Sequence, residues 1–436
     1  MADQVRTVKK LRATAEASAY QKAWFQGLRA RVEAGEDFAY LNADVPMEIL
    51  RAMDIPFVVN QWWAAICGAK RMTTKYFGLL RDAGYRDDLC SYCATALAES
   101  FDPDDHKIGE DGKPMGPWGG LPHPTIAITR LTCDCQGKIF ELFAKNHGAA
   151  FYPMENTVPR KLPYGWWEKA PYDWEDLYDS DRLDAAVQDL KELIAFLEQK
   201  TGKTFDMGKL KEVMDNINEQ EIWYGKIRDM IADSDQVPVT VVDTINAVMP
   251  AQWQRGTRWA AEHAKAMYEE VKELLDSGKP AVPNEKYRLM WIGRGLWHDF
   301  PFYQNFEQKY GAVFMWSMYL AMGADAYIRH HVEKDPLRAL AARYIGMEDF
   351  LHCPPWNNQW FLHEAKHNKI NGVVYMVPEN CMQAVEGSCF IQKCLEDAGI
   401  PVLLFRADPV DPRKWNRDSM TKLVEDFIET RVMKGE

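Results

Sequence analysis

The stretch 124–138, PTIAITRLTCDCQGK, contains an apolar, β-branched run that stops at Cys133 and leads into a helix. The predicted helix covers 138–146 and ends before Gly148, and AAFYPM (149–154) then has the pattern of another strand. Strands and helices that alternate with short connections are typical of a parallel sheet. The stretch therefore predicts a parallel α/β domain.

The same alternation occurs on both sides of a helical middle. Further strands are expected at 55–60, 287–293, 312–317, 371–378 and 400–406, and long helices at 183–200, 205–231 and 252–277. We therefore expect an α/β protein with two parallel-sheet domains of the Rossmann or flavodoxin-like kind, separated by a helical region. The expected divisions are an N-terminal helical arm (1–40), a first α/β domain (41–160), a helical region (161–280) and a second α/β domain (281–436).

Composition excludes several classes of protein. The 436 residues carry a net charge of −12, which argues against a basic face for nucleic acid. No apolar stretch is long enough to cross a membrane, and the first residues lack the apolar segment of a secretory signal. Nine cysteines without such a signal indicate a reducing compartment, so we expect a cytoplasmic protein whose cysteines serve metal or redox chemistry more often than disulfides.

Six of the nine cysteines fall in three short loops, each beside a strand end or a helix start. The loops are DLCSYC (88–93), TCDCQGK (132–138) and EGSCFIQKC (386–394). Since parallel sheets place functional loops at the carboxyl ends of strands, these loops could form one site. Thiolates suit an iron–sulfur cluster, zinc is the rival, and unconnected thiols are the third possibility. Cys67, Cys353 and Cys381 are interpreted as core or incidental cysteines.

Sixteen tryptophans, several of them paired, have two interpretations. They could pack a core or a subunit interface, or they could form flat walls for a planar substrate. The candidates for a substrate wall are Trp62, Trp63, Trp166, Trp167 and Trp297.

The three cysteine loops resemble those of the benzoyl-CoA reductase/2-hydroxyacyl-CoA dehydratase family over about residues 40–420. The matching positions are Cys90-Ser91-Tyr92, Cys133-Asp134 with Lys138, Ser388-Cys389, Gly399-Ile400-Pro401, Asp408, Asp411 and Arg413. The resemblance implies one [4Fe–4S] cluster held by Cys90, Cys133 and Cys389, with one iron position left open. The extra cysteines Cys93, Cys135 and Cys394 leave a double cluster as a variant.

Within the family, chain length and the insertion 164–184 are similar to the aromatic-ring reductases, in particular the B-type subunit of benzoyl-CoA reductase. Gln61 stands where several dehydratase-like sequences have a glutamate, which weakens a base-assisted elimination. The resemblance therefore implies an oxidoreductase subunit that adds single electrons to an aromatic acyl-CoA and yields a cyclohexadiene-carbonyl-CoA. Two alternatives stay open: a 2-hydroxyacyl-CoA dehydratase subunit acting through a ketyl radical, and an electron-relay subunit paired with a catalytic homologue.

The resemblance also implies partners. The chain has no G-x-x-x-x-G-K-[ST] loop, so ATP hydrolysis is expected in a separate iron–sulfur activator, with ferredoxin upstream and a homologous cluster-binding subunit in the same complex. Gly293 and Arg294 could cradle a CoA phosphate at a helix start, although a plain turn also fits. His298 and His123 are candidate proton donors, with structural roles as the alternative.

Overall fold

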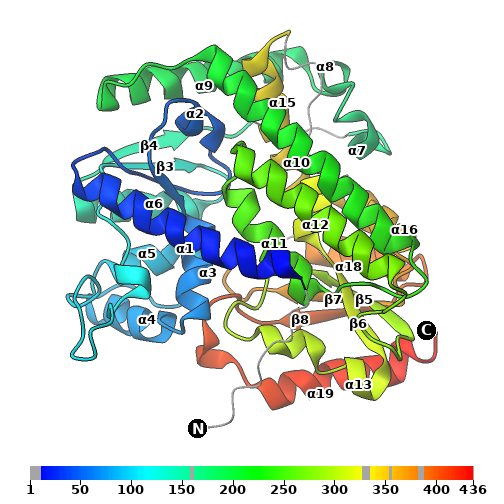
Figure 1. The fold of residues 1–436 in the computed structure, drawn as a ribbon. Helices are drawn as coiled ribbons and strands as arrows, with labels where there is room; N and C mark the ends of the chain where they lie inside the picture. The colour runs from blue at the N-terminus through cyan, green and yellow to red at the C-terminus, as the bar shows by residue number, and fades with distance from the viewer. Residues whose placement is uncertain (1–10, 158–161, 327–333, 353–355, 382–386, 436) are drawn as a thin grey trace.

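The computed structural model describes residues 11–157, 162–326, 334–352, 356–381 and 387–435. It confirms the expected fold class, because it contains two four-stranded sheets in which every pair of neighbouring strands is parallel (Figure 1). The domain boundaries expected at 40, 160 and 280 stay predictions.

The first sheet has the strand order β2-β1-β3-β4. Its strands are β1 (Ala39–Leu41), β2 (Phe57–Val59), β3 (Ile126–Arg130) and β4 (Ala150–Met154). The helices of this part are α2 (Met47–Ala52), α3 (Asn60–Ala69), α4 (Thr73–Asp82), α5 (Ser91–Glu99) and α6 (Asp134–His147). The first three strands are buried along their whole length, which explains their nearly continuous apolar sequences.

The second sheet repeats this arrangement with the order β6-β5-β7-β8. Its strands are β5 (Tyr287–Ile292), β6 (Ala312–Ser317), β7 (Gly372–Val377) and β8 (Val402–Arg406). The accompanying helices are α13 (Glu307–Tyr310), α14 (Met318–Ala326), α15 (Pro336–His352), α16 (Trp356–His367), α18 (Ser388–Glu396) and α19 (Arg417–Phe427).

Each sheet therefore has one point where the strand order reverses. In the first sheet this switch point lies between β1 and β3, and in the second it lies between β5 and β7. The loops that follow neighbouring strands diverge at such a point and leave a crevice beyond the carboxyl ends, which is where open α/β sheets bind ligands. The fold thus predicts a ligand site at the loops after β1, β3, β5 and β7.

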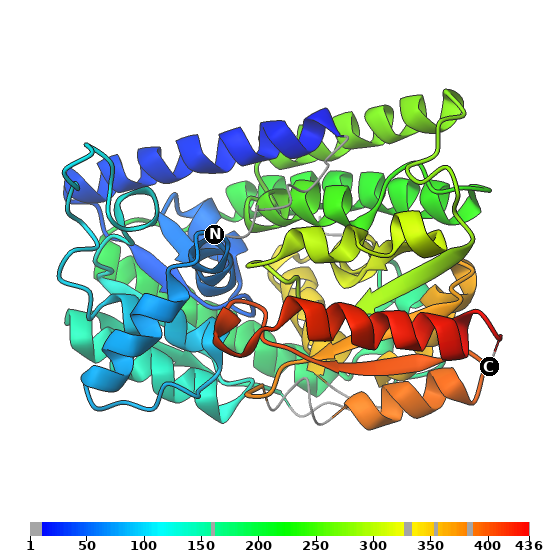
Figure 2. The ribbon, with the colours of Figure 1, turned by 90° about the horizontal axis from the view of Figure 1, so that it is seen from below.

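Long helices lie beside the two sheets (Figure 1). The long helices are α1 (Arg12–Glu33), α9 (Ser180–Thr201), α10 (Met207–Asp233), α11 (Val241–Trp253) and α12 (Arg258–Asp276), and the short helices α7 (Trp166–Lys169) and α8 (Trp174–Leu177) directly precede α9. Four of the long helices pack on one another: α1 and α10 both contact α12, and α1 also contacts α11. Figure 2 shows α1 stretched along one side of the molecule. Its first amides donate to the Glu270 carboxylate of α12, from Arg12 N at 2.7 Å and Ala13 N at 3.0 Å. At its other end Arg29 donates to the Gly120 carbonyl in the first α/β part at 2.7 Å.

Candidate metal centre

Cysteines of the two α/β parts meet where the two switch points face each other. Cys133 follows β3, and Cys381 follows β7 at a comparable distance along the chain. Cys90 precedes α5 and contributes the third loop. The strand ends of both sheets therefore place thiols from three separate segments at one location.

The thiols contact one another directly. Cys90 shares hydrogen bonds with Cys93 and with Cys381, and Cys381 also lies within electrostatic range of Cys133 and Cys135. The thiol of Cys133 donates weakly to Oε1 of Gln136 at 3.8 Å. Five cysteines thus gather at the site, two each from the loops of Cys90 and Cys133 and one from the loop after β7.

Two of these cysteines are helix N-caps. Cys90 caps α5 and Cys133 caps α6, and neither helix has a side-chain hydrogen bond to its first amides. The first-turn amides and the positive end of the helix dipole favour an anionic sulfur or a sulfur-bound metal. Cys93 and Cys135 lie in the first turns of the same helices.

The surroundings keep these sulfurs in the thiol form when no metal is bound. Burial raises the pKa of Cys133 to about 11. For Cys90, the hydrogen bond from Cys381 lowers the pKa, but the contact with Cys93 and burial outweigh it and leave that pKa well above the usual range. Since metals bind thiolates, metal binding here would release protons.

Arg294 supplies the positive charge of the site. Its Nη1 lies 3.5 Å from the Cys381 sulfur, and its guanidinium carbon lies 5.5 Å from the centre of the Tyr92 ring. The preceding Gly293 has φ of 111°, and a Cβ there would lie 2.7 Å from the Met376 carbonyl oxygen, so this turn requires glycine. No α-helix begins directly after Gly295 in this described part of the chain, so the predicted phosphate cradle lacks the helix start it was expected to use.

The remaining cysteines lie in different surroundings. Cys389 is exposed in the first turn of α18, and both Cys389 and Cys381 act electrostatically on the Tyr375 hydroxyl. Cys394 donates weakly to the Asn358 carbonyl at 3.7 Å, and Cys67 is buried in α3. Cys353 falls outside the described residues. Cys381 was interpreted as an incidental core cysteine, but it shares a hydrogen bond with Cys90, which that interpretation does not explain. The cysteine after β7 that contacts the Cys90 thiol is therefore Cys381, whereas the predicted ligand was Cys389.

The tryptophan pair after β2 packs in the core. Trp62 donates to Gln21 of α1 at 2.9 Å, Trp63 donates to the Glu99 carboxyl group, and Phe25 of α1 contacts both rings. Trp63 has no exposed surface. Trp166 and Trp167 are also buried. The structure thus gives these four rings packing roles, and a contact with substrate stays a prediction for each.

Trp297 is the member of the predicted set that lies beside the cysteine site. Its Nε1 donates to the hydroxyl of Tyr92, two residues after Cys90. The neighbouring His298 is buried, its Nε2 lies 3.0 Å from the Asp408 carbonyl, and burial lowers its pKa.

The other two predicted polar residues lie at opposite ends of the first sheet. The Gln61 Oε1 accepts a hydrogen bond from Ala43 N at 2.8 Å, in the loop after β1 and therefore on the edge that carries Cys133. His123 precedes β3, whereas Cys133 follows it, so the length of the strand separates this histidine from the thiols. His123 instead pairs with His147, Nδ1 to Nδ1 at 2.9 Å.

Residues 408–414, here called the clamp loop, fasten the loop of Cys90 to the second sheet. The Asp408 Oδ1 accepts from the Ser91 hydroxyl at 2.7 Å. Arg413 donates to the Asp87 carboxylate and to its carbonyl, both at 2.6 Å, and pairs with Asp411 at 2.7 Å. These three charged residues are among the positions that carry the family resemblance, and two of them, Asp408 and Arg413, contact the residues on either side of Cys90.

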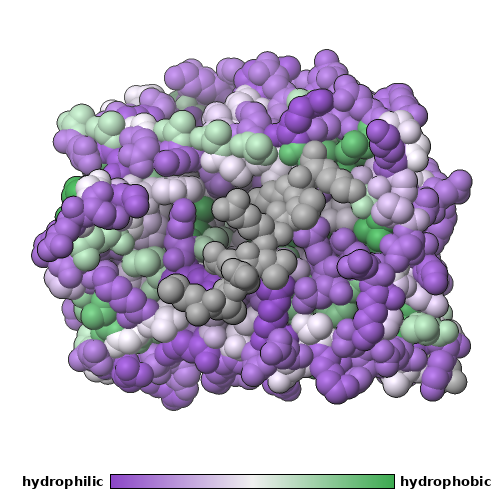
Figure 3. Space-filling model, turned by 60° about the horizontal axis from the view of Figure 1, so that its bottom comes forward, coloured by the Kyte–Doolittle hydropathy of each residue, from purple (hydrophilic) through white to green (hydrophobic). Residues whose placement is uncertain are grey.

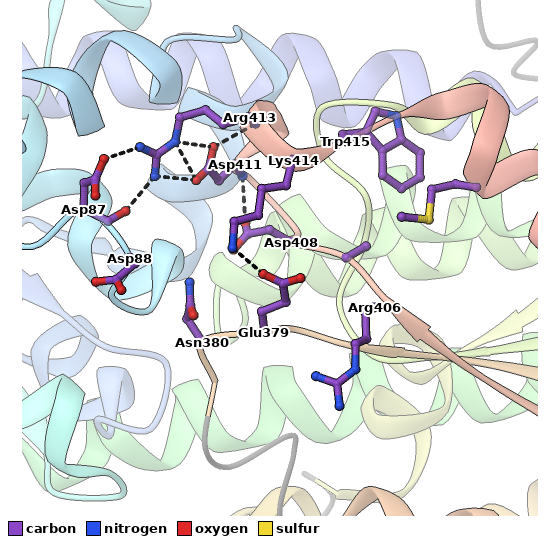
Figure 4. Close-up of a pocket in the computed structure, with 12 residues that line it drawn as sticks. Asp87, Asp88, Glu379, Asn380, Arg406, Asp408, Asp411, Arg413, Lys414 and Trp415 are labelled. Atoms are coloured by element: carbon purple, nitrogen blue, oxygen red, sulfur yellow. Dashed lines mark hydrogen bonds and ion pairs between the residues drawn. The ribbon is translucent and has the colours of Figure 1, made fainter.

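A cavity of about 270 Å³ opens beside the clamp loop (Figure 4). It lies at the carboxyl ends of β7 and β8 and has both charged and flat apolar walls. The side chains drawn and labelled there are Asp87, Asp88, Glu379, Asn380, Arg406, Asp408, Asp411, Arg413, Lys414 and Trp415. Asn380 and Asp408 also line a small hollow whose other walls include Cys90, Cys381 and Arg294. The cavity therefore lies next to the thiols.

The donor set consists of thiols, which suit an iron–sulfur cluster or zinc better than a hard ion. Among the residues that the structure describes, no three or more His, Cys, Asp or Glu side chains already surround one metal-ion position. An iron–sulfur cluster is larger than one ion, and soft thiolates are its usual ligands. The gathered thiols therefore fit a cluster by their chemistry.

Within the described ranges, no helix has the length and apolar character needed to cross a bilayer. The face shown in Figure 3 carries mostly hydrophilic residues, with small scattered apolar patches.

The family comparison covers all the residues that form this site. The family model for the D-component of 2-hydroxyglutaryl-CoA dehydratase matches residues 42–430, which includes every cysteine loop described above. The chain belongs to this dehydratase D-component family. The family resemblance found in the cysteine loops is therefore confirmed.

Members of the family with different reactions resemble this chain at low identity. The alpha subunit of (R)-2-hydroxyisocaproyl-CoA dehydratase from Clostridioides difficile is 21% identical over 91% of this chain and 90% of its own length. The alpha subunit of (R)-phenyllactyl-CoA dehydratase from Clostridium sporogenes is 23% identical over 93% and 92%. The B-type subunit of benzoyl-CoA reductase from Thauera aromatica is 25% identical over 81% and 79%. All three are named as subunits of enzymes that act on acyl-CoA thioesters.

Proposed function

We propose that this chain is the iron–sulfur subunit of an ATP-dependent reductase of the benzoyl-CoA reductase type, with an aromatic acyl-CoA as substrate. The observation that carries the proposal is the meeting of thiols from both switch points beside an open cavity. The relatives are named for reactions of acyl-CoA thioesters, and this supports an acyl-CoA as the substrate class.

Cys90, Cys133 and Cys381 would hold the [4Fe–4S] cluster, because each comes from a different loop and all three converge. Cys389, the third ligand inferred from the resemblance, is the competing proposal. When bound, such a cluster supplies single electrons at low potential. An ATP-hydrolysing activator, a ferredoxin and a homologous subunit would be its partners, since the chain has no P-loop of its own.

The chain's own residues would then bind and shield the thioester. The cavity beside the clamp loop offers the Trp415 ring as a flat wall and the cations Arg406 and Lys414 for negative groups of CoA. His298, buried behind Asp408, is the candidate proton donor on this side. Arg294 and the Trp297 ring would close the site against water from the second sheet.

Dehydration of a 2-hydroxyacyl-CoA is the second candidate, favoured by the dehydratase relatives. At the Gln61 position, the neutral amide accepts a backbone hydrogen bond and offers no carboxylate base, which supports the reductase. The two reactions share the cysteine site and differ in whether electrons are consumed.

The deciding experiment supplies the purified anaerobic chain with its homologous subunit, the activator, ATP and reductant, and then compares two substrates. We expect benzoyl-CoA to be converted to a cyclohexadiene-carbonyl-CoA, with reductant consumed in proportion to product. Turnover of a 2-hydroxyacyl-CoA to the enoyl-CoA with only catalytic reductant, and none of benzoyl-CoA, would assign the chain to the dehydratases instead.

A further inference from the structure

Arg294 is held firmly at the cysteine site by its own backbone. Its carbonyl accepts from Nε1 of Trp291 at 2.8 Å, and the next amide, Gly295 N, donates to the Tyr319 hydroxyl at 2.8 Å. The preceding residue is the positive-φ Gly293. Strand β5, the glycine turn after it and two aromatic side chains therefore fix the backbone of Arg294, so that its side chain lies against the sulfurs.

No carboxylate forms an ion pair with Arg294 among the residues described. Its neighbours are the Cys381 sulfur, Cys90 and the rings of Tyr92 and Tyr319. A guanidinium stays charged at any physiological pH. Among the described side chains, the groups that face the Arg294 charge are therefore sulfurs and tyrosine rings, at the point where sulfur ligands would carry negative charge.

We propose that Arg294 is a positioning residue that sets the reduction potential of the bound cluster by placing one positive charge and one hydrogen bond on the sulfur of Cys381. This inference rests on the proposed function. Adding an electron makes a cluster more negative, and hydrogen bonds and charges near the sulfurs are among the factors that set its potential. The charge of Arg294 favours the reduced state and so raises the potential.

The test compares Arg294→Gln and Arg294→Lys with the parent in anaerobic redox titrations followed by visible absorption and electron paramagnetic resonance. Arg258→Gln is the matched control, because it removes an exposed arginine of α12 that pairs with Glu219 and Glu262. Iron content is measured on every sample, so that cluster loss is separated from a change in potential.

We expect Arg294→Gln to retain iron and to be reduced at a more negative potential. A tenfold fall in the one-electron reduction equilibrium corresponds to about 59 mV. Arg294→Lys should shift less, and the control should match the parent. If Arg294→Gln loses iron, the comparison rests on Arg294→Lys, which should keep iron and be reduced at a potential below that of the parent. An unchanged potential in Arg294→Lys would then count against the inference.

Three results would overturn the inference. The first is an unchanged potential in iron-replete Arg294→Gln, and the second is an equal shift in the glutamine and lysine variants. The third is loss of iron from both variants, which would assign Arg294 a structural role. Absence of iron from the parent would be a different failure, because it would end the proposed function itself.

Discussion

At the scale of single residues, the core and the cysteine site use similar side chains for different purposes. Trp63 is fully buried against Phe25 and donates to Glu99, a carboxyl group whose pKa is raised well above its usual range by burial and by Asp105. Trp297 instead donates to Tyr92, beside Cys90. The surroundings of each indole therefore decide its role.

Replacing Trp63 should affect stability before it affects substrate binding. We expect Trp63→Phe to lower the free energy of unfolding by about 1–3 kcal/mol, because Glu99 loses a donor. Trp63→Ala should cost about 3–5 kcal/mol through the cavity it leaves. Urea unfolding measures both, with exposed Tyr172→Ala as the control. An iron-replete Trp63→Phe of parental stability that binds the thioester poorly would instead favour the substrate wall.

The sequence predicted a site formed by the loops of Cys90, Cys133 and Cys389, and Cys381 was assigned to the core. Cys381 stands alone in VPENC, whereas Cys389 lies beside Ser388 and before a helix, and that local pattern favoured Cys389. The sequence does contain one feature that points to Cys381 as a site residue, namely its distance from the end of a strand. Cys381 follows β7 about as closely as Cys133 follows β3. Contacts between loops of separate sheets are long-range and leave no periodic pattern in the sequence.

At the scale of elements, most strands and helices were predictable because each has its own hydrophobic period. Three features were not. The break between α3 and α4 falls inside a continuous helical pattern, at Arg71, which has φ of 58°. Helix α11 is buried almost all round, so it lacks the polar face on which helix recognition depends. Strand β1 has only three residues, too few to show an alternation.

The short helix α2 depends on a buried ionic network. Glu48 Oε1 lies 2.8 Å from Arg255 Nε and 3.3 Å from Arg343 Nη2, and Oε2 accepts from the Tyr344 hydroxyl at 2.7 Å. Burial alone would raise the pKa of Glu48, but the two guanidinium groups and the hydroxyl outweigh it and lower that pKa to about 2. The network ties α2 to α15 and to the segment after α11.

This network predicts a pH dependence of stability. The folded pKa of Glu48 lies below its ordinary value of 4.5, so its contribution is complete above pH 4.5 and is lost as pH falls toward 2. Glu48→Gln should lower the free energy of unfolding at pH 7 by about 3–5 kcal/mol, because two buried guanidinium groups lose their counter-charge. It should also flatten the decline in stability as pH falls below 4.5.

Urea unfolding of parent and variant, from neutral pH down into the acid range, measures this difference. Glu262→Gln, which removes an exposed i,i+4 partner of Arg258, is the control. Equal pH slopes for Glu48→Gln and the parent would show that Glu48 is not the group that titrates.

At the scale of the whole molecule, the two sheets have matching strand topology, and the clamp loop joins the two α/β parts. The contacts Ser91–Asp408 and Asp87–Arg413 cross from the first α/β part to the second. Thr73 adds a hydrogen bond to the Val410 carbonyl at 2.8 Å. The distance between Cys90 and Cys381 is thus set by contacts between the two α/β parts.

Weakening the clamp loop should loosen the loop of Cys90 without unfolding either sheet. We expect Arg413→Ala to speed amide hydrogen exchange in residues 85–93, because it removes the hydrogen bonds to Asp87. Mass spectrometry of exchanged peptides gives the readout. Lys422→Ala, which breaks an exposed pair with Asp426 on α19, is the control. Unchanged exchange in Arg413→Ala would remove the positioning role from this residue.

The central claim is that thiols from both sheets hold one iron–sulfur cluster. Its most direct test is the iron and acid-labile sulfide content of anaerobically purified parent, Cys381→Ser and Cys389→Ser. We predict iron and sulfide in equal amounts in the parent and in Cys389→Ser, and their loss from Cys381→Ser. Stoichiometric zinc without iron in the parent, or cluster retention in Cys381→Ser with loss from Cys389→Ser, would contradict the account.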